Sequence, residues 1–208
     1  MFHVKQSSTA PSAAVSRETI ERLNAYAALL LRWNQTINLI SKHDEPDFWQ
    51  RHVEDALQLQ PHMPPNLDRF IDLGSGAGIP GLILAIASDV HVHLVESDQR
   101  KSAFLLEAIR VTQAPASVHT ARIEVVQLLP ARLVTARALA PLAQLIGLAE
   151  RFIGQDGILL APKGHRAEVE LTAARAQWHM TLDRAPSKTS ADATILKISE
   201  VRRVGHEI

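Results

Sequence analysis

The spacing of apolar residues changes at about residue 66 of this 208-residue chain. Before that point, apolar side chains recur at helical intervals between Ile20 and Ile37, and Ser16 is placed to cap the first turn. The pattern predicts an amphipathic helix that ends near residues 33–39, and a second short helix over residues 47–59. Prolines at positions 61, 64 and 65 then exclude regular helix. We therefore expect a flexible tail over residues 1–15 and a helical N-terminal region over residues 16–65.

After residue 66, short apolar runs alternate with longer amphipathic segments. Strands are predicted over residues 69–73, 91–95, 117–120, 133–136 and 158–161, and the remainder of the chain after residue 177, including residues 193–198, is also predicted to form strands. Helices are predicted over residues 80–87, 98–112, 123–128, 141–153 and 166–177, with a turn at residues 154–157. This alternation is typical of an α/β fold in which helices cover both faces of a mostly parallel sheet. We assign residues 66–208 to this one domain.

Glycine is concentrated directly after the first predicted strand. The strand, residues 69–73, is followed by eight positions of which four are glycine, at 74, 76, 78 and 81. Glycine lets the backbone turn sharply and approach a ligand closely because it has no Cβ. Pro80 suits the first turn of the following helix, whose N-terminus would face the same loop. The segment therefore predicts a cofactor loop between a strand and a helix.

Two cofactor classes compete for this loop. Residues 76–81 have the G-x-G-x-x-G spacing of dinucleotide-binding proteins. In that pattern the first glycine follows the strand directly, but here the glycine that ends the strand is Gly74. The remaining pattern, D-x-G-x-G-x-G from Asp72 through Gly74 and Gly76 to Gly78, resembles motif I of S-adenosylmethionine (SAM) dependent methyltransferases. Asp72 would then serve the cationic end of the methionine, directly or through water.

Acidic and apolar residues at the ends of the next two strands complete an adenosine site. Glu96 ends the second strand, where open α/β sheets bind ligands, and its carboxylate can accept both hydroxyls of a ribose. Both SAM and NAD carry that ribose, so Glu96 does not choose between them. After the third strand, Ile123 can pack on an adenine ring, and Glu124 or the nearby backbone can take its amino group.

Two basic residues stand apart from the others in the second half of the chain. Arg137 directly follows one predicted strand and Lys163 comes just after another, at the same edge of the sheet as the glycine loop. A pair of cations at the mouth of the site suits a substrate that carries phosphate. We predict both as the catalytic cations of the site.

Composition excludes several other kinds of chemistry. Cysteine is absent, which removes disulfides, thiolate zinc sites and cysteine nucleophiles. His91 and His93 share one strand face and could bind a metal, but no third ligand is evident, so we expect no metal site. No segment reads as a leader or a membrane span, and we expect a cytoplasmic protein without a membrane partner. The formal net charge of zero means that binding to nucleic acid must come from local patches.

Taken together, the motifs resemble those of the GidB/RsmG family, the bacterial methyltransferases that modify N7 of a guanine in small-subunit (16S) rRNA. The resemblance extends from Trp33 to Lys163. The segments that carry it are Trp33-Asn34, 38–41, 51–55, 69–81, Arg100-Lys101, 121–124, 135–138 and 162–164.

The resemblance implies a Rossmann-like class I methyltransferase fold with seven strands, of which the last is antiparallel, and a small helical N-terminal region. It also implies the cofactor, SAM, and the partner, 16S rRNA in the small ribosomal subunit. The residues that it implies for SAM binding are Gly74, Ile79, Ile123, Glu124 and Arg137, with the ribose at Glu96. We expect a monomer.

Guanine N7 carries a lone pair and no proton, so methyl transfer to it needs no general base. A cation against the base would oppose the transfer, which assigns Arg137 and Lys163 to phosphate, ribose or the cofactor carboxylate. Two other functions stay open: an NAD-dependent oxidoreductase and a non-catalytic module that binds rRNA. The glycine register disfavours the first, and the intact motif of Asp72, the glycine loop and Glu96 disfavours the second.

Overall fold

The N-terminal region is helical, as predicted. The computed structural model describes residues 15–205, so the predicted tail lies, but for its last residue, outside the described part. Helix α1 (Arg17–Asn34) begins where expected, because the Oγ of Ser16 accepts the N–H of Thr19 at 3.1 Å. The other helical segments here are η1 (Lys42–Asp44), η2 (Trp49–Glu54), α2 (Asp55–Leu57) and η3 (Gln60–His62). The second predicted helix is therefore present, although its first half, η2, has π geometry.

Seven strands form one sheet, in the order β3-β2-β1-β4-β5-β7-β6. They are β1 (Arg69–Leu73), β2 (His91–Glu96), β3 (Ala116–Thr120), β4 (Ala131–Thr135), β5 (Ile153–Lys163), β6 (Trp178–Pro186) and β7 (Thr194–Arg203). The first five strands are parallel to one another, and β7 runs antiparallel to both β5 and β6. The mostly parallel seven-stranded sheet with an antiparallel last strand is confirmed.

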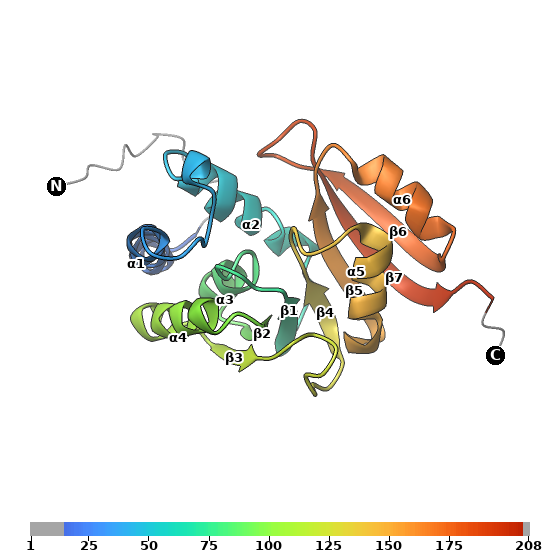
Figure 1. The fold of residues 1–208 in the computed structure, drawn as a ribbon, viewed down its shortest axis with the longest axis horizontal. Coiled ribbons are helices and arrows are strands. Elements are labelled where there is room, and N and C mark those ends of the chain that lie inside the picture. Colours follow the sequence, from blue (N-terminus) through green and yellow to red (C-terminus); the bar gives the residue numbers. More distant parts are fainter. Residues whose placement is uncertain (1–14, 206–208) are drawn as a thin grey trace.

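Helices cover both faces of the sheet (Figure 1). They are α3 (Gly81–Ser88), α4 (Gln99–Thr112), α5 (Leu142–Ala149), η4 (Glu150–Phe152) and α6 (Ala167–Arg175). Alternate residues of β1 point to opposite sides: Phe70 joins a core with α1, α3 and α4, whereas Ile71 and Leu73 join a second core with α5 and α6. The carboxyl ends of β1, β2 and β4 lie at one edge, between these two cores.

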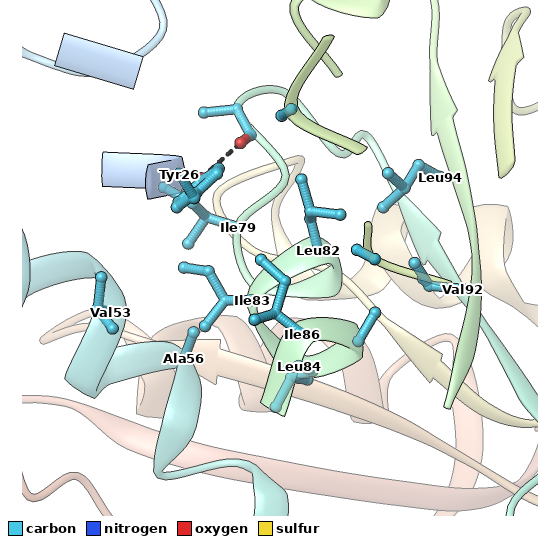
Figure 2. Packing of buried hydrophobic residues seen from close by; sticks show 14 of the residues in the cluster. Tyr26, Val53, Ala56, Ile79, Leu82, Ile83, Leu84, Ile86, Val92 and Leu94 are labelled. Carbon is cyan, nitrogen blue, oxygen red and sulfur yellow. Dashed lines mark hydrogen bonds between the residues drawn. The ribbon is translucent and has the colours of Figure 1, made fainter. Parts of the chain in front are cut away.

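The N-terminal region shares the first core with the glycine-loop helix α3. Tyr26 of α1 is fully buried, and its hydroxyl donates to the backbone oxygen of Ala77 at 2.6 Å (Figure 2). From the next helical segments, Val53 and Ala56 lie beside Ile83 of α3 in the same view. The helices before residue 65 are thus packed against the back of the predicted cofactor loop.

The short helix predicted over residues 123–128 is wrong. The segment makes one turn, in which the N–H groups of Val125 and Val126 both donate to Arg122. The segment does not continue as a helix, and the backbone oxygens of Ile123 and Val126 accept hydrogen bonds from Nη2 of Arg151, each at 2.6 Å. A side chain from η4 thus satisfies backbone oxygens of this irregular segment.

The turn predicted at residues 154–157 is also wrong, because β5 begins at Ile153 and includes these residues. Ile153 pairs with Ala131 and Ile158 with Leu133, so the strand carries extra residues as a bulge. At Gly157 an added Cβ would lie 2.8 Å from the backbone oxygen of Ala131. The same Cβ would lie 2.8 Å from the backbone oxygen of Gly154, so Gly157 allows both the close approach of β4 and the sharp bend of the bulge within β5.

Candidate functional site

The glycine loop has the backbone that its sequence predicted. Gly74, Gly76 and Gly78 have φ angles of +64°, +55° and +83°, which L side chains rarely adopt. An added Cβ would lie 2.5 Å from Cδ1 of Leu139 at Gly74, and 2.8 Å from Cβ of Leu82 at Gly78. Gly76 differs, because no atom lies closer than 3.9 Å to its added Cβ. The open position on the loop is therefore at Gly76.

Asp72 is enclosed beneath the start of α3, with 1% of its surface exposed. Its Oδ1 accepts the hydroxyl of Thr135 at 2.6 Å, while its Oδ2 has no well-formed hydrogen bond in the described part of the chain. The hydroxyl of Ser75 and the N–H of Gly81 nevertheless lie near enough to the carboxylate to lower its pKa. Gly81 makes room for it, since a Cβ there would lie 2.5 Å from Cβ of Asp72. Burial raises the pKa of Asp72 to about 6. A cation or a hydrogen-bond donor beside Oδ2 would stabilise the ionised form of Asp72.

Glu96 joins three loops at the carboxyl edge of the sheet. Its Oε2 accepts the N–H of Gly76 at 2.8 Å, and its Oε1 accepts the N–H of Asp98 at 2.8 Å. Its backbone oxygen accepts the N–H of Ala121, which follows β3, at 3.1 Å. A carboxylate has about four acceptor sites, so both oxygens of Glu96 can still accept a hydroxyl. The predicted ribose acceptor therefore lies against the predicted glycine loop.

Ile123 and Glu124 lie in the segment after β3, close in sequence to Ala121, which donates to the backbone oxygen of Glu96. Ile123 is 9% exposed and belongs to the core beneath α5, whereas Glu124 is exposed. Their predicted contacts with adenine stay a prediction. Ile79, which precedes Pro80 at the start of α3, is buried in the other core.

Arg137 lies two residues beyond Thr135, at the end of β4, and has partners from the N-terminal region. Its Nη1 pairs with Oδ2 of Asp55 at 2.9 Å, and its Nη2 is 2.6 Å from Nδ1 of His52. Burial, together with the positive charge of Arg137, lowers the pKa of His52 to about 4. His52 is therefore neutral near pH 7, and its Nδ1 accepts the hydrogen bond from the guanidinium.

Lys163 has a different set of partners from Arg137. Its Nζ pairs with Oε2 of Glu170 at 2.9 Å and donates to the backbone oxygen of Ala140 at 2.8 Å. The same Glu170 oxygen accepts the N–H of Leu142 at the start of α5. With 9% of its side chain exposed, Lys163 is held inside this cluster. The predicted role of both cations toward a substrate stays a prediction, and the contacts of Lys163 support the positioning of residues 137–141.

Sequence reasoning did not assign roles to His52, Asp55 and Thr135. His52 and Asp55 lie three residues apart in a helical segment and therefore share one face. This spacing could have suggested a joint role. Thr135 gave no such signal, because its importance depends on the pairing of β1 with β4, in which it lies opposite Asp72.

A polar cavity of about 310 Å³ lies beside the start of α4. Its lining residues are Thr36, Ile37, Asn38, Asp98, Arg100 and Lys101. Asp98 caps α4 by accepting the N–H groups of Arg100 and Lys101 at 2.8 and 3.2 Å. Because Asp98 also donates to Glu96, the cavity adjoins the predicted ribose position.

The histidines of β2 meet a third histidine from β3. Nδ1 of His93 is 3.0 Å from Nε2 of His119, and His91 hydrogen-bonds Ser117. Within residues 15–205, no group of three or more histidine, aspartate or glutamate side chains has an arrangement that could hold a metal ion. In the same range, no helix combines the length and apolar character needed to cross a bilayer.

The sheet order and the glycine loop define a Rossmann-like class I methyltransferase fold. Among solved structures, the ribosomal protein L11 methylase of Lactobacillus delbrueckii subsp. bulgaricus is similar, with a TM-score of 0.58 over 72% of this chain and 78% of that one. The two sequences are 15% identical, so the likeness concerns the fold alone.

Sequence comparisons show the family. The profile described as GidB, rRNA small subunit methyltransferase G, matches residues 19–195. Proteins called ribosomal RNA small subunit methyltransferase G are 47% identical in Granulibacter bethesdensis, over 98% of this chain and 100% of the relative, and 50% identical in Rhodospirillum centenum, over 93% and 90%. The chain belongs to the GidB family of rRNA small subunit methyltransferases G.

Proposed function

We propose that this protein transfers a methyl group from SAM to N7 of a guanine in the 16S rRNA of the small ribosomal subunit, acting as a monomer in the cytoplasm. The observation that carries the proposal is the hydrogen bond between Glu96 and the glycine loop at Gly76, in a chain of this family. In SAM enzymes of this fold, the carboxyl edge of the sheet is where the cofactor binds.

The residues present fit SAM. Positive φ angles at Gly74, Gly76 and Gly78 give a loop without Cβ atoms, and Glu96 retains acceptor capacity for a ribose. Asp72, whose Oδ2 has no well-formed hydrogen bond, favours a cation at this end of β1, directly or through a water molecule. When bound here, SAM supplies an activated methyl group on a positively charged sulfur.

The chain's own contribution to the transfer is geometric. Guanine N7 presents a lone pair without a proton, so no side chain has to act as a base. The loop and Glu96 fix the cofactor position, and orientation of the two reactants provides the rate gain. Arg137 then orients a phosphate, a ribose or the cofactor carboxylate, because a cation placed against the purine would oppose its growing positive charge.

Isothermal titration of the full chain with SAM and, separately, with NAD tests the cofactor. Labelled SAM is then supplied with small ribosomal subunits and with naked 16S rRNA, and the methylated nucleotide is mapped by mass spectrometry. We expect SAM binding and label at one guanine. Binding of NAD alone, or label in no rRNA substrate, would overturn the proposal.

A further inference from the structure

Arg137 is fixed at the end of β4 by residues that are more than 80 positions away in the sequence. Nη1 of the guanidinium donates to Asp55, and Nη2 donates to neutral His52. Nη1 also donates a longer hydrogen bond, of 3.3 Å, to the backbone oxygen of Arg51. The side chains of Arg137 and Asp55 are only 21% and 17% exposed. Water and salt therefore screen this ion pair less than they screen a surface pair.

The other oxygen of Asp55 is anchored independently of Arg137. Its Oδ1 accepts the hydroxyl of Thr189 at 2.6 Å and the amide of Gln58 at 2.8 Å. Thr189 belongs to the connection between β6 and β7, and the Oε1 of Gln58 accepts the N–H of Lys188 from the same connection at 2.7 Å. Asp55 thus binds Arg137 through Oδ2 and the connection between β6 and β7 through Oδ1.

Arg137 is in turn close to the cofactor loop. It is separated from Thr135 by one residue, and Thr135 hydrogen-bonds Asp72. The next residue in the chain is Ala138, whose φ of +53° is uncommon for alanine, and it is followed by Leu139, whose side chain lies against Gly74. Arg137 therefore belongs to the same short segment as Leu139, which covers the glycine loop at Gly74.

We propose that Asp55 is a positioning residue for methyl transfer, which holds the guanidinium of Arg137 at the cofactor site and is itself fixed by Thr189. The inference rests on the proposed function. A free arginine side chain samples many rotamers, and ordering it when ligand binds would cost entropy. An aspartate fixed by two further donors supplies that order in advance, which is the advantage of preorganised sites.

The variant Asp55→Asn separates the two oxygens. The asparagine oxygen can still accept from Thr189 and Gln58, but its NH2 group then faces the donors of Arg137 and cannot accept from them. We expect a loss of roughly ten- to hundredfold in SAM affinity or in kcat/KM, the size that small misplacements cause. Thr189→Val, which removes the hydroxyl that donates to Asp55, should cause a smaller loss of SAM affinity or kcat/KM. Thr189→Ser keeps the hydroxyl and should have wild-type values.

A double-mutant cycle distinguishes positioning from a general structural effect. If Asp55 acts through Arg137, then Asp55→Asn has no further effect on SAM affinity or kcat/KM in an Arg137→Ala background. Equal losses with and without Arg137 would overturn the proposal, and so would wild-type values for Asp55→Asn. Glu168→Gln, which removes the partner of Arg184 on the surface, is the matched control and should leave both quantities unchanged.

The outcomes also separate this inference from the proposed function. If the wild-type chain binds SAM but methylates no rRNA, the proposed function fails, and the cycle in SAM affinity still decides whether Asp55 positions Arg137. If the wild-type chain methylates rRNA and the two losses are additive, only the role of Asp55 fails. Absence of SAM binding in the wild-type chain would overturn both.

Discussion

Thr135 donates a 2.6 Å hydrogen bond to Asp72, although the two residues are 63 positions apart in the chain. The bond connects β4 to β1 at the carboxyl edge of the sheet, and both residues are buried. It partly offsets the effect of burial on the pKa of Asp72, which is nevertheless raised to about 6. The ionised form of the motif I acid therefore depends on a residue of another strand.

Thr135→Val should destabilise the fold in a pH-dependent way. Removing the donor from a buried carboxylate costs roughly 1–3 kcal/mol. Because the pKa of Asp72 is raised on folding, the folded chain binds more protons than the unfolded chain between about pH 4 and 6, and the loss should shrink as Asp72 is protonated. Urea unfolding at pH 8 and pH 5 measures it.

The control for that experiment is Thr181→Val, because the hydroxyl of Thr181 donates to the exposed carboxylate of Glu200. Its effect should stay below about 0.5 kcal/mol at both pH values. An equal loss for Thr135→Val at pH 8 and pH 5 would contradict the assignment of a charge-dependent bond.

Gly74→Ala should abolish SAM binding, because a Cβ would clash with Leu139 and the φ of +64° disfavours alanine. Adding Leu139→Ala removes the clash but not the backbone strain, so the double variant should recover part of the affinity. Gly76→Ala, strained but without a close neighbour, should lose less. Titration calorimetry compares the three, and equal affinities for Gly74→Ala and Gly76→Ala would show that the contact with Leu139 is unimportant.

His93 should make the fold less stable as the pH falls from about 6.5 to 4. Burial, together with the neighbouring charges of His119, His91 and Arg69, lowers the pKa of His93 to about 4. The unfolded chain therefore takes up a proton near its ordinary pKa of about 6.5 while the folded chain does not, which favours unfolding.

In His93→Gln the loss of unfolding free energy between pH 7.5 and pH 5 should accordingly be smaller than in the wild type. The opposite contribution of Asp72 is common to both chains and cancels in the comparison. Urea titrations measure the difference, and exposed His179→Gln serves as control. Identical pH dependence in His93→Gln and the wild type would exclude His93 as a contributor.

Lys163→Met tests whether Lys163 is structural or acts on the substrate. Breaking a mostly buried ion pair leaves Glu170 without its cation, which should cost about 3 kcal/mol of unfolding free energy. Glu170→Leu added to the same chain should recover part of it. Lys197→Met, which breaks an exposed contact of 3.7 Å with Asp183, should change stability by less than about 1 kcal/mol. Lost activity at unchanged stability would instead support the role toward substrate that the sequence predicted.

Much of the fold and of the cofactor edge follows from local sequence. The glycines after β1, the cap at Ser16 and the acid that ends β2 depend on neighbours within a few residues, and their patterns identified the elements correctly. The two failures, at residues 123–128 and 154–157, have a different origin. In each, the segment is held by a distant partner: Arg151 donates to carbonyls of one segment, and pairing with β4 includes the other in a strand.

The sequence alone determined which chemical groups stand at the ends of the strands, because strand ends and glycine positions are local properties of the chain. Only the tertiary structure decided what those groups contact. Arg137 reads as a free cation beside a loop, but folding brings it against Asp55 and His52, which precede it by more than 80 residues. Hydrogen bonds between such distant segments form only after the sheet and the N-terminal helices have packed, so no spacing along the chain specifies them.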